Sequence, residues 1–135
     1  MVDQEVPDIP GADAVSAWFG RWPSFHDAEV LHLHLNRAGV SHLRIHAWNM
    51  SSNRSEVDAE GHLRTDKHAI VTFQLTDISD LELFDFSSQN VLAGLEVVQE
   101  GSRIRIELSP SYGLGGRIDA GGVTVSFSPG KPASG

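Results

Sequence analysis

Short runs in which apolar and polar residues alternate recur along most of this chain, and they constrain its fold more than any other feature of the sequence. Residues 28–36 alternate Leu with His, and residues 42–48 alternate aliphatic residues with His, Arg and Trp. Because successive side chains of a strand point to opposite faces, each run predicts a half-buried β-strand. The expected apolar faces are Leu31, Leu33 and Leu35 in the first run and Leu43, Ile45 and Ala47 in the second. The connection Arg37-Ala38-Gly39 has an odd length, which keeps these faces on the same side, so the two runs predict a β-hairpin.

Later runs carry the same alternation and are bounded by residues that favour turns. The predicted strands cover residues 67–77, 81–86, 94–100, 102–110 and 121–129. Residues 117–119 are a candidate for a short extra strand, and residues 87–93 are a candidate for a helical turn. Within that turn, the amides of Gln89 and Asn90 are expected to bond to the backbone and to be structural. Residues 50–66 are rich in Ser, Asp and Glu, which predicts a long exposed connection.

One segment follows a helical pattern instead. Residues 12–19 place Ala, Val, Trp and Phe at largely helical spacing, with Asp13 as a candidate N-cap. Gly20 and Pro23 then end the helix, because Gly permits the left-handed C-terminal turn and Pro disfavours helical geometry in the residue before it. The chain is therefore predicted to be an α+β domain, with one short N-terminal helix and a curved antiparallel sheet or partly closed barrel of about six to eight strands.

Length and composition favour a single domain inside the cell. The 135 residues, 40% of them hydrophobic, are enough for one core, which we assign to residues 1–128, with a flexible tail at residues 129–135. The chain has no Cys, which excludes disulfides and thiolate metal sites and fits a reducing cytosol. Its start is acidic where a signal peptide is basic, and no apolar run approaches the ~18 residues of a membrane span. We therefore expect a soluble, cytoplasmic protein that contacts no membrane.

The charge balance narrows the expected partners. Ten Lys and Arg residues stand against eighteen Asp and Glu residues, which leaves a formal net charge of −8. This sign is wrong for binding phosphates, so nucleic acid is not an expected ligand. An acidic surface instead favours a basic protein partner.

The outward face of the predicted hairpin is the strongest candidate for a site. It carries His32, His34, His42 and His46, together with Arg44 and Trp48. Opposed side chains on neighbouring strands approach to ~5 Å between Cβ atoms, so these four imidazoles are a candidate metal site. Arg44, however, places a cation within any such cluster. The favoured interpretation is a solvated polar face, with a metal-binding protein or metal-dependent enzyme as the alternative.

A second candidate is His26-Asp27-x-Glu29, whose residue types suit a general base with an orienting carboxylate. Adjacent side chains of an extended backbone point apart, and no Ser or Thr nucleophile motif accompanies the pair. We therefore favour a turn in which Asp27 caps backbone N–H groups and His26 donates to a carbonyl. The residues before this turn are expected to plug one end of the core, namely Trp22, Pro23 and Phe25.

Two segments carry a resemblance to a known family. The first joins WFG at residues 18–20 to WPSFHDAEV at residues 22–30, and the second has the pattern DLELFDF…QN…L at residues 80–92. Over residues 14–125 the chain resembles the immunity protein 50 family, which are small bacterial proteins of polymorphic toxin systems. The resemblance implies a small α+β protein that binds and neutralises a cognate toxin, with no catalysis and no cofactor of its own. The family motif, mainly structural, then comprises Trp22, Pro23, Phe25, His26, Asp27 and Glu29.

A toxin-binding role gives the polar face of the hairpin a function. The expected contact residues are His32, His34, Arg44, His46 and Trp48 on the hairpin and Glu56, Asp58 and Glu60 in the connection after it. Trp and Arg are enriched among the residues that dominate binding energy at interfaces, and the acids suit a basic toxin. The alternative is that Trp48 turns inward beneath residues 50–66.

Overall fold

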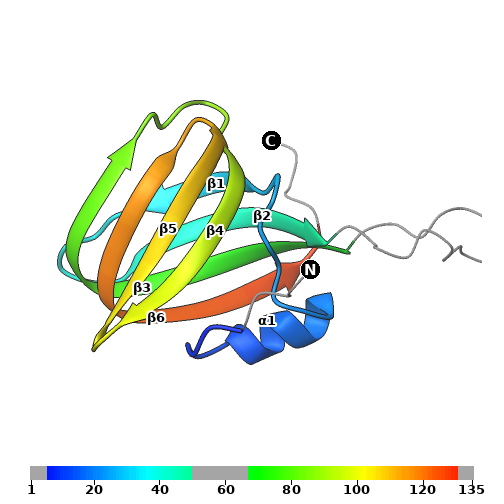
Figure 1. Ribbon diagram of the computed structural model, residues 1–135, viewed down its shortest axis with the longest axis horizontal. Coiled ribbons are helices and arrows are strands. Elements are labelled where there is room, and N and C mark those ends of the chain that lie inside the picture. The colour runs from blue at the N-terminus through cyan, green and yellow to red at the C-terminus, as the bar shows by residue number, and fades with distance from the viewer. Residues whose placement is uncertain (1–5, 50–66, 131–135) are drawn as a thin grey trace, which may run out of the picture.

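The computed structural model of the chain describes residues 6–49 and 67–130, and within them it has one helix and six strands (Figure 1). The elements are α1 (Ala12–Phe19), β1 (Glu29–His34), β2 (Ser41–Asn49), β3 (Lys67–Phe84), β4 (Val91–Glu100), β5 (Arg103–Tyr112) and β6 (Gly115–Pro129). Neighbouring strands pair antiparallel, and their order closes in a ring, β1-β2-β3-β6-β5-β4. The predicted α+β class is confirmed, with a sheet that closes in a ring in place of a regular barrel.

β3 and β6 are long strands that each replace two predicted elements. β3 joins the runs at residues 67–77 and 81–86 as far as Phe84, and β6 takes in residues 117–119 together with 121–129. The two strands pair along nearly their whole length, and Ser79 is an extra residue in the register of β3. A bulge of this kind bends a strand and increases its twist. Figure 1 shows β3 and β6 curving together from one side of the ring to the other, which allows the sheet to close.

α1 has the predicted length but a different start. Its N-cap is Gly11 in a left-handed conformation, without a side-chain hydrogen bond, and Asp13 lies in the first turn. The predicted Asp13 cap is therefore wrong. The chain enters the helix from a contact with β6, where the backbone N–H of Val125 donates to the carbonyl of Pro10 at 2.9 Å. Gly20 ends the helix in a left-handed conformation with φ of 90°, as predicted.

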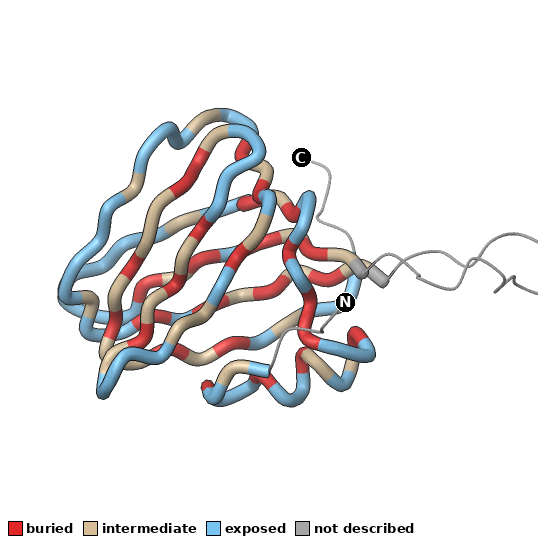
Figure 2. The backbone as a smooth tube through the Cα atoms, in the orientation of Figure 1, coloured by how far each residue is buried: buried red, intermediate tan, exposed pale blue. Residues whose placement is uncertain are grey.

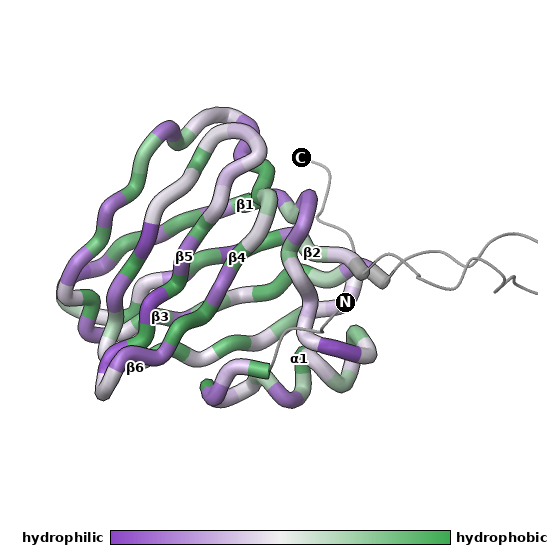
Figure 3. The backbone as a smooth tube through the Cα atoms, viewed as in Figure 1, coloured by the Kyte–Doolittle hydropathy of each residue, from purple (hydrophilic) through white to green (hydrophobic). Residues whose placement is uncertain are grey.

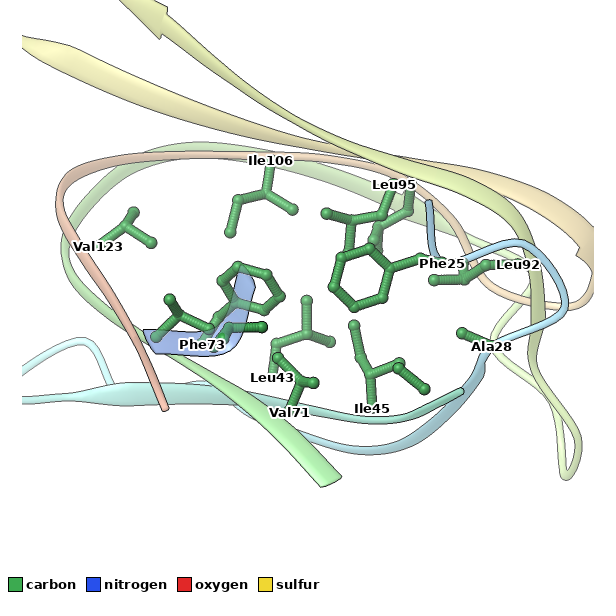
Figure 4. Packing of buried hydrophobic residues seen from close by; sticks show 14 of the residues in the cluster. Phe25, Ala28, Leu43, Ile45, Val71, Phe73, Leu92, Leu95, Ile106 and Val123 are labelled. Carbon is green, nitrogen blue, oxygen red and sulfur yellow. The ribbon is translucent and has the colours of Figure 1, made fainter. Parts of the chain in front are cut away.

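The aromatic residues after α1 fill one end of the core. Trp22 and Phe25 are 4% and 1% exposed, and their rings lie 6.4 Å and 6.0 Å from the ring of Phe73 on β3. Figure 4 shows Phe25 inside the ring of strands, among apolar side chains of β2, β3, β4 and β5. The predicted role of this segment as a plug is confirmed.

The sheet itself follows the predicted alternation over most of its length. Along β5, buried Ile104, Ile106 and Leu108 alternate with half-buried charged residues. Figure 2 and Figure 3 show that burial and hydropathy also alternate along the strands in general. On β2, the predicted inward residues Leu43, Ile45 and Ala47 are all fully buried.

β1 departs from its predicted alternation by one residue. Val30 pairs with Ile45 and Leu33 pairs with Leu43, while Leu31 is an extra residue in the register. Because this bulge shifts the alternation, Val30 is buried and Leu31 is exposed, opposite to the prediction. Leu35 lies beyond the strand and is also exposed, so the predicted apolar face holds for Leu33 alone.

The connections also differ from prediction in places. The hairpin of β1 and β2 is confirmed, with a turn in which the N–H of Gly39 donates to the carbonyl of Asn36. Residues 87–93 form no helical turn, because β4 already begins at Val91. β6 continues through Pro129, into the predicted tail, whereas the remaining tail residues 131–135 and the connection 50–66 lie outside the described residues. Among the described residues, none forms a helical segment with the length and apolar character of a membrane span.

Candidate functional site

Five histidines gather on the outer face of β1, β2 and the first half of β3. Ala47 and Ala69 pair with each other and are fully buried. Trp48 follows Ala47, His68 precedes Ala69, and these two residues also pair. Because successive side chains of a strand point to opposite faces, Trp48 and His68 lie on the outer face. By the same alternation, the other histidines and Arg44 on β1 and β2 also lie on the outer face. We call this group the histidine face, and it consists of His32, His34, His42, Arg44, His46, Trp48 and His68.

One half of the histidine face is a compact aromatic cluster. The Nε2 atom of His46 lies 3.0 Å from Nδ1 of His68, and the two rings stack at 5.2 Å with an interplanar angle of 25°. The Trp48 ring lies 5.1 Å from that of His46 and 6.0 Å from that of His68. Trp48 therefore lies on the outer face of the sheet, while the alternative that it turns inward beneath residues 50–66 involves residues outside the described part of the chain. Because a hydrogen bond needs one donor and one acceptor, at least one imidazole of the pair is neutral when this bond forms.

The other half is a row of imidazoles across β1 and β2. His34 lies 6.2 Å from His32 and 6.3 Å from His42, measured between ring centroids, and Arg44 pairs with His32 in the register. Residues 6–49 and 67–130 contain no group of three or more His, Asp or Glu side chains arranged to hold a metal ion. This holds for the candidate metal set His32, His34, His42 and His46.

His68 was not among the predicted site residues. The run at residues 67–77 predicts a strand with His68 opposite its apolar face, but the sequence does not say which strand lies beside it. The β2–β3 pairing decides this, because it sets Trp48 against His68 and His46 against Ile70. Among the predicted contact residues, Glu56, Asp58 and Glu60 lie outside the described residues.

The second predicted constellation is an exposed turn. Phe25 and Asp27 have φ of 61° and 63°, in the left-handed region, and the N–H of Ala28 donates to the carbonyl of Phe25. This backbone brings Nδ1 of His26 to 3.3 Å from a carboxylate oxygen of Asp27, so the expectation that the two side chains point apart is wrong. In the described turn, Ser24 Oγ accepts from the backbone N–H of His26, and the His26 ring contacts the Asp27 carboxylate. The predicted bonds, from Asp27 to backbone N–H groups and from His26 to a carbonyl, are not among the described contacts of this turn.

Glu29 lies apart from the His26–Asp27 pair. It is half-buried at the start of β1 and pairs in the register with His46 of the histidine face. The motif therefore does not assemble a base with two carboxylates. Its described geometry serves the turn from α1 into β1.

Asn90 is a buried structural residue, as predicted, whereas its predicted partner in this role, Gln89, is exposed. Its Oδ1 accepts from the backbone N–H groups of Ser87 and Leu114, both at 2.9 Å, and its Nδ2 donates to the carbonyl of Ser87 at 2.8 Å. These bonds join the connection before β4 to the residue before β6. One side chain thus fixes two distant loops.

A network of charged residues covers the outer face of β3, β5 and β6 and the end of β4, and it was not predicted. It consists of Arg103, Arg105 and Arg117 with Asp77, Asp80, Glu82, Glu100, Glu107 and Asp119. Nε of Arg105 donates to Asp119 at 2.8 Å, and this bond, helped by nearby carboxylates, raises the pKa of the Arg105 guanidinium above its ordinary value. Three cations among six acids leave this face acidic.

Comparison of the chain with protein-family models, with curated proteins and with solved structures finds no match. The function therefore has to be argued from the residues and their geometry.

Proposed function

We propose that this protein is a binding module that neutralises a partner protein by direct contact, and that the partner is a bacterial toxin. The histidine face carries the proposal, because it sets Trp48 and Arg44 among five histidines on adjacent strands of one sheet. Trp and Arg are enriched among residues whose truncation costs most binding energy. A face built on paired strands is also ordered before binding, which reduces the entropy lost on association.

Two properties of the chain support the choice of partner. The WPSFHDAEV segment resembles the motif of the immunity protein 50 family, whose members are toxin-neutralising proteins. The formal net charge of −8 favours a basic toxin, since opposite charges speed association and disfavour wrong partners.

Co-expression tests the proposed role. We expect the chain to restore growth to cells that express the toxic protein encoded beside its gene, and to co-purify with that protein. If growth is not restored and no complex forms, the proposed function is wrong.

The contact surface is tested by separate substitutions on the histidine face. We expect Trp48→Ala and Arg44→Ala each to weaken toxin binding about thirtyfold or more, the effect of losing a hot-spot residue of about 2 kcal/mol. Gln99→Ala, at an exposed position of β4, serves as the control and should leave the affinity unchanged. Titration calorimetry gives the affinity and thermal unfolding gives the stability of each variant.

Because Arg44 is exposed, its replacement is expected to leave the melting temperature unchanged even if Trp48→Ala lowers it. A loss of affinity at constant stability supports the surface. If both Arg44→Ala and Trp48→Ala leave the toxin affinity unchanged, the histidine face is not the binding surface.

A further inference from the structure

The ring of strands is open between the end of β1 and the second half of β3. β2 pairs with β3 only as far as Ser41↔Leu75, and beyond that point β3 pairs with β6 alone among the described strands. β1 likewise shares a single ladder pair with β4, Glu29↔Val91. Past these positions, the free edges of β1 and β3 present backbone N–H and C=O groups that no described strand pairs.

Inward-facing leucines are left partly uncovered at this opening. Leu81 pairs with the fully buried Ile118, so both face the core, yet Leu81 is 39% exposed. Leu33 pairs with the fully buried Leu43 and is itself only half-buried. At this opening, therefore, two leucines that face the core are incompletely covered.

Two hollows that share one lining residue lie along this opening. Their volumes are about 540 and 270 Å³, and Leu35 lines both. On the opposite side, residues 77–81 of β3 line the larger hollow, and residues 83–86 line the smaller one. Of the eight exposed large hydrophobic side chains among the described residues, four line these hollows. They are Leu35, Leu81, Phe84 and Phe86. We call this feature the edge groove.

Charge around the edge groove selects the kind of partner. Asp77, Asp80 and Asp85 line it together with Arg37, and Asp77 and Asp80 also form ion pairs with Arg103 and Arg117 of the neighbouring charged network. The groove lining and this network together hold seven acids and four arginines, a net charge of −3. A second copy of this chain, with its formal charge of −8, would meet like charges there. Charged residues on a free edge disfavour self-pairing and leave a basic strand as the complementary occupant.

We propose that the edge groove binds an extended segment of a basic partner protein, which adds a strand to the free edge of β3 at residues 78–84. Strand addition satisfies the unpaired backbone groups, and alternate apolar side chains of the segment cover Leu81 and Leu83. At ~3.3 Å per residue, this edge takes a segment of about seven residues. The site is separate from the histidine face and does not depend on the toxin-binding role proposed above.

A labelled eight-residue peptide that alternates Val with Lys is the probe, with fluorescence anisotropy as the measurement. We expect it to bind at least about tenfold more tightly than a matched peptide that alternates Val with Glu. N-methylation of alternate backbone amides on the edge-facing side should abolish binding, because it removes the donors of the added strand. No binding at about 1 mM, equal binding of the two charge forms, or full binding of the N-methylated peptide overturns the proposal.

Two exposed aromatic residues provide matched variants in the protein. Phe86, 64% exposed, lines the edge groove, whereas Tyr112, 61% exposed, lies outside it at the end of β5. We expect Phe86→Ser to weaken peptide binding about tenfold, and Tyr112→Ser and Arg44→Ala to change it less than twofold. Equal effects of Phe86→Ser and Tyr112→Ser on peptide binding overturn the proposal. NMR spectra recorded with and without the peptide give a second test, in which the backbone amide signals of residues 78–84 should shift. If the signals of the histidine face shift in their place, the proposal is also overturned. Arg44→Ala keeps this result distinct from a failure of the toxin-binding role.

Discussion

At the scale of single residues, Phe25 is where backbone strain and core packing meet. Its φ of 61° is unusual for a bulky residue and costs of the order of 1–3 kcal/mol. The ring is nonetheless held in the core, 5.8 Å from the ring of Trp22 and 6.0 Å from that of Phe73. Packing of the aromatic cluster therefore stabilises a turn that the local backbone disfavours.

We expect Trp22→Ala and Phe25→Ala each to lower the free energy of unfolding by ~3–5 kcal/mol, the range for deleting a core aromatic. Urea denaturation followed by fluorescence measures this change. Ser24→Ala, at an exposed position between them, is the control and should cost less than about 1 kcal/mol. An unchanged unfolding midpoint for Trp22→Ala would show that the ring does not pack in the core.

Asn90 is the polar counterpart of this aromatic plug. We expect Asn90→Ala to destabilise the protein by about 3 kcal/mol or more, because it leaves backbone groups of Ser87 and Leu114 without their buried partner. The exposed neighbour Gln89 gives the control Gln89→Ala, with an expected change within about 0.5 kcal/mol. Similar thermal unfolding of the two variants would contradict the structural role of Asn90.

At the scale of the strands, the β3–β6 pair depends on one close backbone approach. Gly116 has a φ of 131°, and a Cβ atom there would collide with the carbonyl oxygen of Glu82 on β3. Gly94 on β4 has no neighbouring atom within 4 Å of the same position. The two glycines therefore differ in whether the fold requires them.

We expect Gly116→Ala to lower the free energy of unfolding by well over 1 kcal/mol, since Ala cannot adopt that conformation without strain. Gly94→Ala should be neutral or stabilising by ~0.4–1 kcal/mol, because it restricts only the unfolded chain. Chemical denaturation of both variants checks the contrast. Equal stabilities would mean that the second half of β3 does not pair with β6 in this register.

At the scale of the whole molecule, the ring is closed by very few contacts. β1 and β4 share the pair Glu29↔Val91, and the hydrogen bonds around it include those from Val30 N–H to Asn90 O and from Leu92 N–H to Ala28 O. By contrast, β3 and β6 pair from Ala69 to Phe84. The junction of β1 and β4 is the weakest part of the ring.

Native-state hydrogen exchange measures this difference. We expect the amides of Val30 and Leu92 to exchange through local opening, at a free energy below that of global unfolding, while the bonded amides of the β3–β6 ladder exchange only on global unfolding. Equal protection at both places would show that the ring opens and closes as one unit.

Much of the candidate site was predictable from the sequence. The alternation in residues 42–48 places Arg44, His46 and Trp48 on one side of a strand, and the structure sets His32 and His34 beside them. His68 was missed because its place depends on which strand pairs with β2, and that pairing crosses the connection at residues 50–66. The edge groove was missed for the same reason, since a free edge is defined by the strands that do not reach it.

The sequence by itself determined the α+β class, the extent of α1 and the inward face of β2, because each depends on spacing along a short stretch of chain. Only the tertiary structure decided the bulges at Leu31 and Ser79, the joining of two predicted strands into β3, and the order in which the ring closes. A shift of one residue in register turns a strand over, and pairing between distant segments selects that register by covering the core as a whole. No local sequence pattern predicts this register, because contacts between residues far apart in the chain determine its free energy.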